Sequence, residues 1–280
     1  MIMRYACIPL QNITNSNVWQ SSQYRFIDMN NSRFRDTISS VRKRISRWTL
    51  KDYQRFYSDK VECLWEAINL STDDYYYNTW ESQEIMEKLL EFQFHDYACA
   101  NGKTTFEAVK TFMQEVYDIC ERKLPKKNTL ELIGPAGSGK SYFADMICAF
   151  YLNVGHARNW NKNENFPLQS CVHRRIILWN EAQIEQCAHD SVKLLLGGDP
   201  CPANIKYMDI QTISRTPVII TANRRYLPFN EPFNQRMIRY DWLSALFLKD
   251  YSKKPHPLTF INLLLHYEVN IDKDINLLEI

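Results

Sequence analysis

Residues 134–141, Gly-Pro-Ala-Gly-Ser-Gly-Lys-Ser, fit the pattern G-x-x-x-x-G-K-[ST] of a phosphate-binding loop. Glycines allow backbone N–H groups to turn inward around a phosphate, where a Cβ would intrude. Lys140 is expected to reach the β- and γ-phosphates of ATP, and the Ser141 hydroxyl to bind Mg²⁺. A fortuitous glycine turn is the alternative, and the apolar segments on both sides argue against it. The predicted nucleotide-binding residues are Gly134, Pro135, Ala136, Gly137, Ser138, Gly139, Lys140 and Ser141.

An acidic residue follows the apolar segment 174–179. Phosphate-loop enzymes place the carboxylates that serve the metal and the attacking water at the end of such a buried strand. Glu181 is therefore the candidate general base, and Ser141, Asn180 and Glu181 are the candidate metal-side residues. Asn180 stands where an acid is expected, so metal binding could be weak and hydrolysis slow. The alternative for Glu181 is a solvated acid at the start of a helix.

Two further polar residues are candidates for the catalytic set. Asn223 follows the apolar segment 217–221, where ring ATPases place a residue that senses the γ-phosphate. A turn-forming asparagine is the simpler alternative. Arg236 is the candidate arginine finger, acting on ATP in a neighbouring subunit, and its alternative is an ordinary surface arginine. The predicted catalytic residues are Lys140, Glu181, Asn223 and Arg236.

Short apolar segments alternate with helical patterns from residue 128 onward, which predicts an α/β fold with a mostly parallel, buried sheet. The expected strands are 129–133, 174–179 and 217–221, and the expected helices are 140–152 and 185–196. Before residue 128 the pattern is helical. The predicted parts are 1–50 (polar and basic, structure uncertain), 51–127 (helical, oligomerisation type), 128–245 (the ATPase core) and 246–280 (a C-terminal extension).

Composition limits the class of protein. The chain has 280 residues, 45% hydrophobic residues and a net charge of +2, so any DNA contact must come from a local cluster of charge. The basic segment 33–47 is either a nucleic-acid or nuclear-import patch or a solvated helix face. Scattered cysteines indicate free thiols in a reducing compartment. No secretory leader or membrane span is recognised, and an intracellular protein without a membrane partner is expected.

These motifs, in this order, resemble the superfamily 3 helicase domain of parvovirus, densovirus and adeno-associated virus replication proteins. Close similarity covers residues 129–241, about two fifths of the chain. The matching segments are Gly134–Ser141; Glu164–Pro167 before Ile176–Glu181; Lys193–Gly198; Thr216–Asn223; and Gln235–Met237.

The resemblance implies an AAA+-like core that assembles into a ring, commonly a hexamer, and translocates on single-stranded DNA. It also implies that the segment after Gly198 is a hairpin in the central channel. Lys206 then grips the DNA backbone, and Met208 replaces a second lysine of the adeno-associated relatives. Tyr207 could stack on a base. The family's nicking domain carries a His-hydrophobe-His motif, which is absent here, so no nickase activity is expected from this chain.

The leading hypothesis is an ATP- and Mg²⁺-dependent DNA helicase that acts in viral genome replication in the host nucleus. A different class of function is a nucleotide-dependent DNA-binding regulator or scaffold in which Asn180 has slowed hydrolysis. A cellular AAA+ ATPase that remodels proteins fits the segments around residues 179–181 and 197–198 less well.

Overall fold

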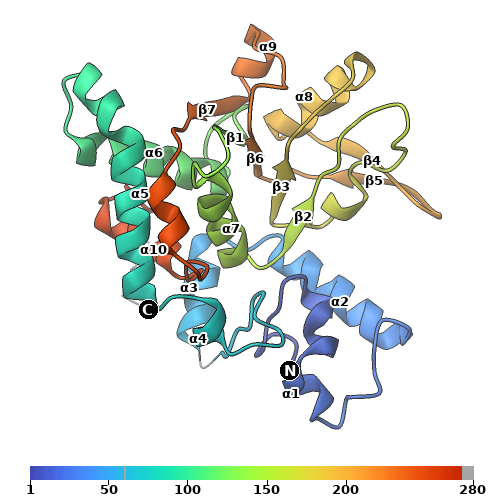
Figure 1. The fold of residues 1–280 in the computed structure, drawn as a ribbon. Helices are drawn as coiled ribbons and strands as arrows, with labels where there is room; N and C mark the ends of the chain where they lie inside the picture. The colour runs from blue at the N-terminus through green and yellow to red at the C-terminus, as the bar shows by residue number, and fades with distance from the viewer. Residues whose placement is uncertain (60, 273–280) are drawn as a thin grey trace.

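A five-stranded sheet lies at the centre of the computed structural model, which describes residues 1–59 and 61–272 (Figure 1). The strand order is β2-β3-β6-β1-β7, and every neighbouring pair is parallel. The predicted α/β fold with a parallel sheet is therefore confirmed. The strands are β1 (Thr129–Ile133), β2 (Val154–His156), β3 (Ile176–Asn180), β6 (Val218–Ala222) and β7 (Met237–Asp241).

The apolar segments form strands because both faces of the sheet are covered. Along β3, Ile176 and Leu178 belong to one hydrophobic cluster, and Ile177 and Trp179 belong to a second. Alternate side chains of a strand point to opposite faces, so the two clusters lie on opposite sides of the sheet. The helices of the core and the short turns near them are α7 (Lys140–Phe150), η2 (Gln169–Cys171), η3 (Gln186–Ala188), α8 (His189–Gly197), α9 (Glu231–Asn234) and η4 (Leu246–Asp250).

The part of the chain before the sheet is helical, as predicted. Its two long helices, α5 and α6, each begin with a capping box, in which the N-cap side chain and the N3 glutamate satisfy free backbone N–H groups. The elements are η1 (Leu10–Asn15), α1 (Asn17–Gln20), α2 (Ser32–Ile45), α3 (Leu50–Ser58), α4 (Thr72–Tyr75), α5 (Thr79–Ala100) and α6 (Thr105–Cys120).

Both ends of the described chain pack on the same hydrophobic cluster as α5, α6 and α7. The basic segment forms α2, whose buried Phe34, Ile38 and Ile45 join that cluster. Near the other end, α10 (Thr259–His266) packs against α5, α6 and α7. Residues 273–280 of the predicted extension lie outside the described residues, and the predicted division into four parts stays a prediction.

A separate antiparallel hairpin projects from the core (Figure 1). It consists of β4 (Cys201–Ile205) and β5 (Met208–Ile213). The glycine pair before it ends α8, and Gly198 has φ of 77°, a left-handed conformation that suits glycine. Lys206 and Tyr207 form the tip of the hairpin.

Candidate nucleotide-binding site

The phosphate loop joins β1 to α7, so its backbone N–H groups lie at the N-terminus of a helix. A Cβ at Gly134 would come within 2.5 Å of the Trp242 carbonyl oxygen, so this position needs glycine. Gly139 has φ of 86° at the N-cap of α7, a conformation that glycine adopts without strain. The loop thus has the open, glycine-lined cradle that phosphate oxygens require.

Lys140 points to the polar end of β6. Its Nζ donates hydrogen bonds to Asn223 Oδ1 at 2.9 Å and to the Pro135 carbonyl oxygen at 3.3 Å. Burial lowers the pKa of Lys140, and the nearby Glu181 carboxylate partly offsets that effect. The residue is a buried cation held beside the loop, so a phosphate would supply a charge partner that Lys140 otherwise lacks.

Glu181 lies directly beside Asn223. Its carboxylate oxygens accept hydrogen bonds from the Asn223 backbone N–H at 3.0 and 3.3 Å, while its own N–H donates to the Thr221 carbonyl oxygen at 2.8 Å. The residue has φ of 49°, which is uncommon for a side chain other than glycine and often occurs at functional sites. The structure therefore brings Lys140, Glu181 and Asn223 together from three elements.

Asn180 lies at the end of β3, one residue before Glu181. Its Oδ1 accepts a hydrogen bond from the Thr221 hydroxyl at 2.7 Å. One lone pair of that oxygen stays available, since an amide oxygen has two. Among the described residues no group of three or more His, Cys, Asp or Glu side chains could hold a metal ion by itself. A magnesium ion at this edge would need oxygen atoms of the nucleotide together with those of Ser141, Asn180 or Glu181.

Arg236 lies at the opposite edge of the sheet. The Asn128 N–H, just before β1, donates to the Arg236 carbonyl oxygen at 3.1 Å, and the phosphate loop follows the far end of β1. The five residues of β1 span about 16 Å at roughly 3.3 Å per residue. The structure therefore does not bring Arg236 to the other predicted catalytic residues of its own chain.

Lys206 is likewise apart from the phosphate loop, at the tip of the hairpin. Its backbone N–H donates to Gln169 Oε1 at 3.1 Å, while its ammonium group lies 4.9 Å from the centre of the Tyr207 ring. The Tyr207 side chain is 91% exposed, although such a side chain usually packs against the protein. The tip presents a cation and an aromatic face to solvent.

Gln93 on α5 holds the phosphate loop and was missed by the sequence analysis. Its Nε2 donates to the carbonyl oxygens of Ser138 at 2.9 Å and Leu243 at 2.8 Å, and its Oε1 accepts from the Leu243 N–H at 2.7 Å. Gln93 is buried, so each of these bonds is shielded from water. No local signal marks a glutamine inside a long helix as a partner of residues 45 and 150 positions away.

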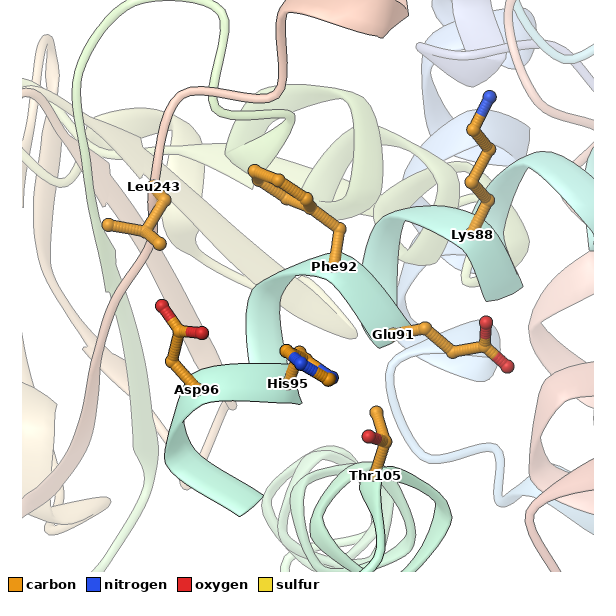
Figure 2. A pocket seen from close by; sticks show the side chains of 7 residues that line it. All are labelled: Lys88, Glu91, Phe92, His95, Asp96, Thr105 and Leu243. Carbon is orange, nitrogen blue, oxygen red and sulfur yellow. The ribbon is translucent and has the colours of Figure 1, made fainter. Parts of the chain in front are cut away.

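A shallow pocket beside α5 lies next to this contact. Figure 2 shows Leu243 on the segment after β7, facing Phe92 and Asp96 of α5. Its lining residues are Lys88, Glu91, Phe92, His95, Asp96, Thr105 and Leu243.

Comparisons with known proteins agree with this fold and site. Residues 107–235 match the family described as parvovirus non-structural protein NS1. Among solved structures, JCV Helicase with a bound inhibitor-like acetamide aligns with a TM-score of 0.53 and 16% identity, covering 82% of this chain and 66% of that one. A second structure of JCV Helicase aligns with a TM-score of 0.50 and 17% identity, covering 86% of this chain and 63% of that one. The fold is that of the superfamily 3 helicase domains.

The relatives in sequence are viral. The initiator protein NS1 of Bombyx mori densovirus is 36% identical over 74% of this chain and 24% of its own length. The initiator protein NS1 of Junonia coenia densovirus is 34% identical over 74% of this chain and 40% of its own length. Protein Rep52 of adeno-associated virus 2 is 32% identical over 43% of this chain and 32% of its own length. The chain is thus a relative of the parvovirus and densovirus NS1 proteins, and it spans about a quarter to two fifths of the densovirus proteins it matches.

No helix among the described residues is long and apolar enough to cross a membrane.

Proposed function

We propose that the chain is an ATP-dependent DNA helicase of the superfamily 3 type, acting in viral single-stranded DNA genome replication. The observation that carries the proposal is the group formed by Lys140, Glu181 and Asn223 at the mouth of the phosphate loop. A cation, a carboxylate and an amide in reach of one another are the parts that ATP hydrolysis needs. The similarity to viral initiator proteins supports a role in replication.

Each residue has a proposed role. Lys140 binds the β- and γ-phosphates, and the Ser141 hydroxyl binds Mg²⁺ together with the polar end of β3. Glu181 accepts a proton from the attacking water, because its carboxylate is fixed by the Asn223 N–H. The Asn223 side chain, which holds Lys140 through its Oδ1, would sense the γ-phosphate.

The proposed assembly is a homo-oligomeric ring, with six subunits as the expected number. Arg236 lies too far from its own phosphate loop to act there, so its proposed target is ATP bound to a neighbouring subunit. The hairpin tip would lie in the channel, where Lys206 contacts a DNA phosphate and Tyr207 stacks on a base. The proposed place of action is the host nucleus.

Strand displacement is the decisive test. The wild-type chain with ATP and Mg²⁺ should unwind a duplex that carries a single-stranded tail, and Lys140→Ala should abolish both unwinding and ATP turnover. Lys206→Ala should keep basal turnover but lose its stimulation by DNA. Near-normal turnover by Lys140→Ala would rule out the nucleotide site, and undiminished stimulation in Lys206→Ala would rule out the hairpin role.

A second candidate function is a nucleotide-dependent DNA-binding regulator or scaffold. The observation that favours it is Asn180, which lacks the charge of an acid and whose amide oxygen already accepts a bond from Thr221. Weaker metal binding would slow hydrolysis without removing nucleotide binding. Tight ATP binding with no measurable turnover at saturating Mg²⁺ would favour this function over the helicase.

A further inference from the structure

A group of basic side chains gathers where α2 meets the turn before β3. Lys43 and Arg47, from the end of α2 and the turn after it, both lower the pKa of His173 through their positive charges, and Arg42 likewise lowers the pKa of Arg174. These effects require the charges to lie close together, although about 130 residues separate the two segments. We call Lys43, Arg47, His173 and Arg174 the basic patch.

A buried asparagine joins the two segments. Asn153 Nδ2 donates to the carbonyl oxygens of Arg42 at 3.0 Å and His173 at 2.9 Å, while its Oδ1 accepts from Arg174 Nη1 at 3.1 Å. Asn153 is 1% exposed, so this arrangement is held from inside the protein. The basic patch is therefore a built feature and not a chance meeting of mobile side chains.

The charge of the basic patch is not neutralised within the chain. Within residues 1–59 and 61–272, no carboxylate forms an ion pair with Lys43, Arg47, His173 or Arg174. Lys43, Arg47 and His173 are exposed. Cations grouped without counter-charges repel one another, and a polyanion would relieve that repulsion.

The basic patch is continuous with the proposed DNA-binding hairpin through η2. The Lys206 N–H donates to Gln169 Oε1 at 3.1 Å, and in the next residue the Ser170 carbonyl oxygen accepts from Arg174 Nε at 2.8 Å. A single short turn thus contacts the hairpin tip on one side and the basic patch on the other. In Figure 1, α2 and the β4–β5 hairpin both project toward the right of the molecule.

We infer that the basic patch binds the phosphate backbone of single-stranded DNA and extends the track that begins at Lys206 onto α2. This inference rests on the proposed function, because it adds a second DNA contact to the same strand. Backbone contacts of this kind are independent of base sequence and depend strongly on salt. The alternative occupant, an acidic protein segment, is separated by the experiment.

The test compares two double variants of equal charge on and just beyond the same helix. Lys43→Glu/Arg47→Glu removes two cations of the basic patch, while Arg33→Glu/Arg35→Glu changes two exposed arginines at the other end of α2. Fluorescence anisotropy with a labelled thymidine oligonucleotide, without nucleotide, gives the affinity and its salt dependence. Basal ATP turnover and thermal melting check that both variants are folded.

The patch variant should bind DNA at least 10-fold more weakly, and its slope of log K against log salt should be shallower by about 2, since each lost phosphate contact removes roughly 1. The control variant should stay within about twofold of wild type. Equal loss in both variants, or no loss in either, would overturn the inference, while loss of binding in Lys206→Ala would still support the hairpin. Absence of DNA binding by the wild type would overturn both. Loss of binding to a poly-glutamate peptide, with DNA binding intact, would assign the patch to an acidic partner instead.

Discussion

At the scale of single residues, Glu181 combines backbone strain with a fixed side chain. A left-handed residue other than glycine costs on the order of 1–3 kcal/mol and persists only where its surroundings hold it. The Thr221 carbonyl oxygen holds its N–H, and the Asn223 N–H holds its carboxylate. The strain is therefore compensated by bonds that aim the carboxylate at the end of β6, next to Lys140.

The first prediction concerns that carboxylate. Glu181→Gln should keep ATP binding and lower turnover by roughly 10²–10⁴-fold, because the amide accepts no proton from water. Turnover and nucleotide affinity should be measured on the same preparation. Glu185→Gln is the matched control, because Glu185 is exposed four residues later and bonds only to the loop at Lys162. Turnover near the wild-type level in Glu181→Gln would mean that another group takes the proton.

At the scale of elements, the ends of the parallel strands decide which residues meet. Buried strands such as 129–133 and 217–221 could be predicted from apolar segments, and polar residues after parallel strands must share one edge of the sheet. The meeting of Glu181 with Asn223 was therefore accessible from sequence. The start of β3 was not: it begins at Ile176, two residues later than predicted, because Arg175 turns inward to an ion pair with the buried Glu121.

Contacts between distant elements were beyond reach of the sequence, because their partners lie far apart in the chain. Gln93 has no local feature that indicates its bonds to Ser138 and Leu243, and the same holds for Asn153 between α2 and the turn at His173. Periodicity reports which face of a helix is buried, and it does not report which loop that face contacts.

The second prediction tests the contact between α5 and the phosphate loop. Gln93→Ala leaves buried groups of Ser138 and Leu243 without partners, which should lower the free energy of unfolding by about 1–3 kcal/mol. It should also raise the KM for ATP more than it lowers kcat, because the loop loses its support. Gln93→Glu should not rescue, since a carboxylate cannot donate to the two carbonyl oxygens.

Gln83→Ala on the same helix is the matched control, because the Gln83 side chain bonds only to Glu87. A loss of stability with an unchanged KM for ATP would make Gln93 a purely structural residue. Chemical denaturation and steady-state kinetics separate the two outcomes.

At the scale of the whole molecule, His256 connects three parts of the chain. Its backbone N–H donates to Ser82 Oγ of α5 at 2.8 Å, its ring lies 4.9 Å from the Trp65 ring, and its Nδ1 accepts from the Leu258 N–H at 3.3 Å. Burial lowers the pKa of His256 from 6.5 to about 4. The imidazole is therefore neutral in the folded protein over most of the acidic range.

The third prediction follows from the sign of that shift. Below pH 6.5 the unfolded chain takes up a proton that the folded chain resists until about pH 4. The His256 contribution is therefore full above pH 6.5 and is lost as the pH falls toward 4, by at most roughly 3 kcal/mol at about 1.4 kcal/mol per pH unit. Urea unfolding between pH 7 and 4 should show a shallower decline for His256→Gln than for wild type. Equal slopes would contradict the assignment.

The fourth prediction concerns the assembly and depends on Arg236. β1 separates this residue from the phosphate loop of its own chain, so a catalytic role requires the ATP site of another subunit. Arg236→Ala should therefore keep ATP binding and lose turnover by roughly 10³–10⁵-fold. Lys140→Ala should lose turnover through the opposite half of the same site.

Mixing the two inactive variants gives the sharper result. In a mixed ring, a Lys140→Ala subunit still offers its Arg236 to a neighbour whose phosphate loop is intact, so part of the turnover should return. Neither variant alone should regain activity at the same total concentration, which makes each its own control. If mixed rings form, as a tagged co-purification can establish, and turnover stays at the level of the single variants, Arg236 does not act across the interface. In that case the packing of Arg236 beside Gly197 is its whole role, and the ring must complete its ATP site with a different residue.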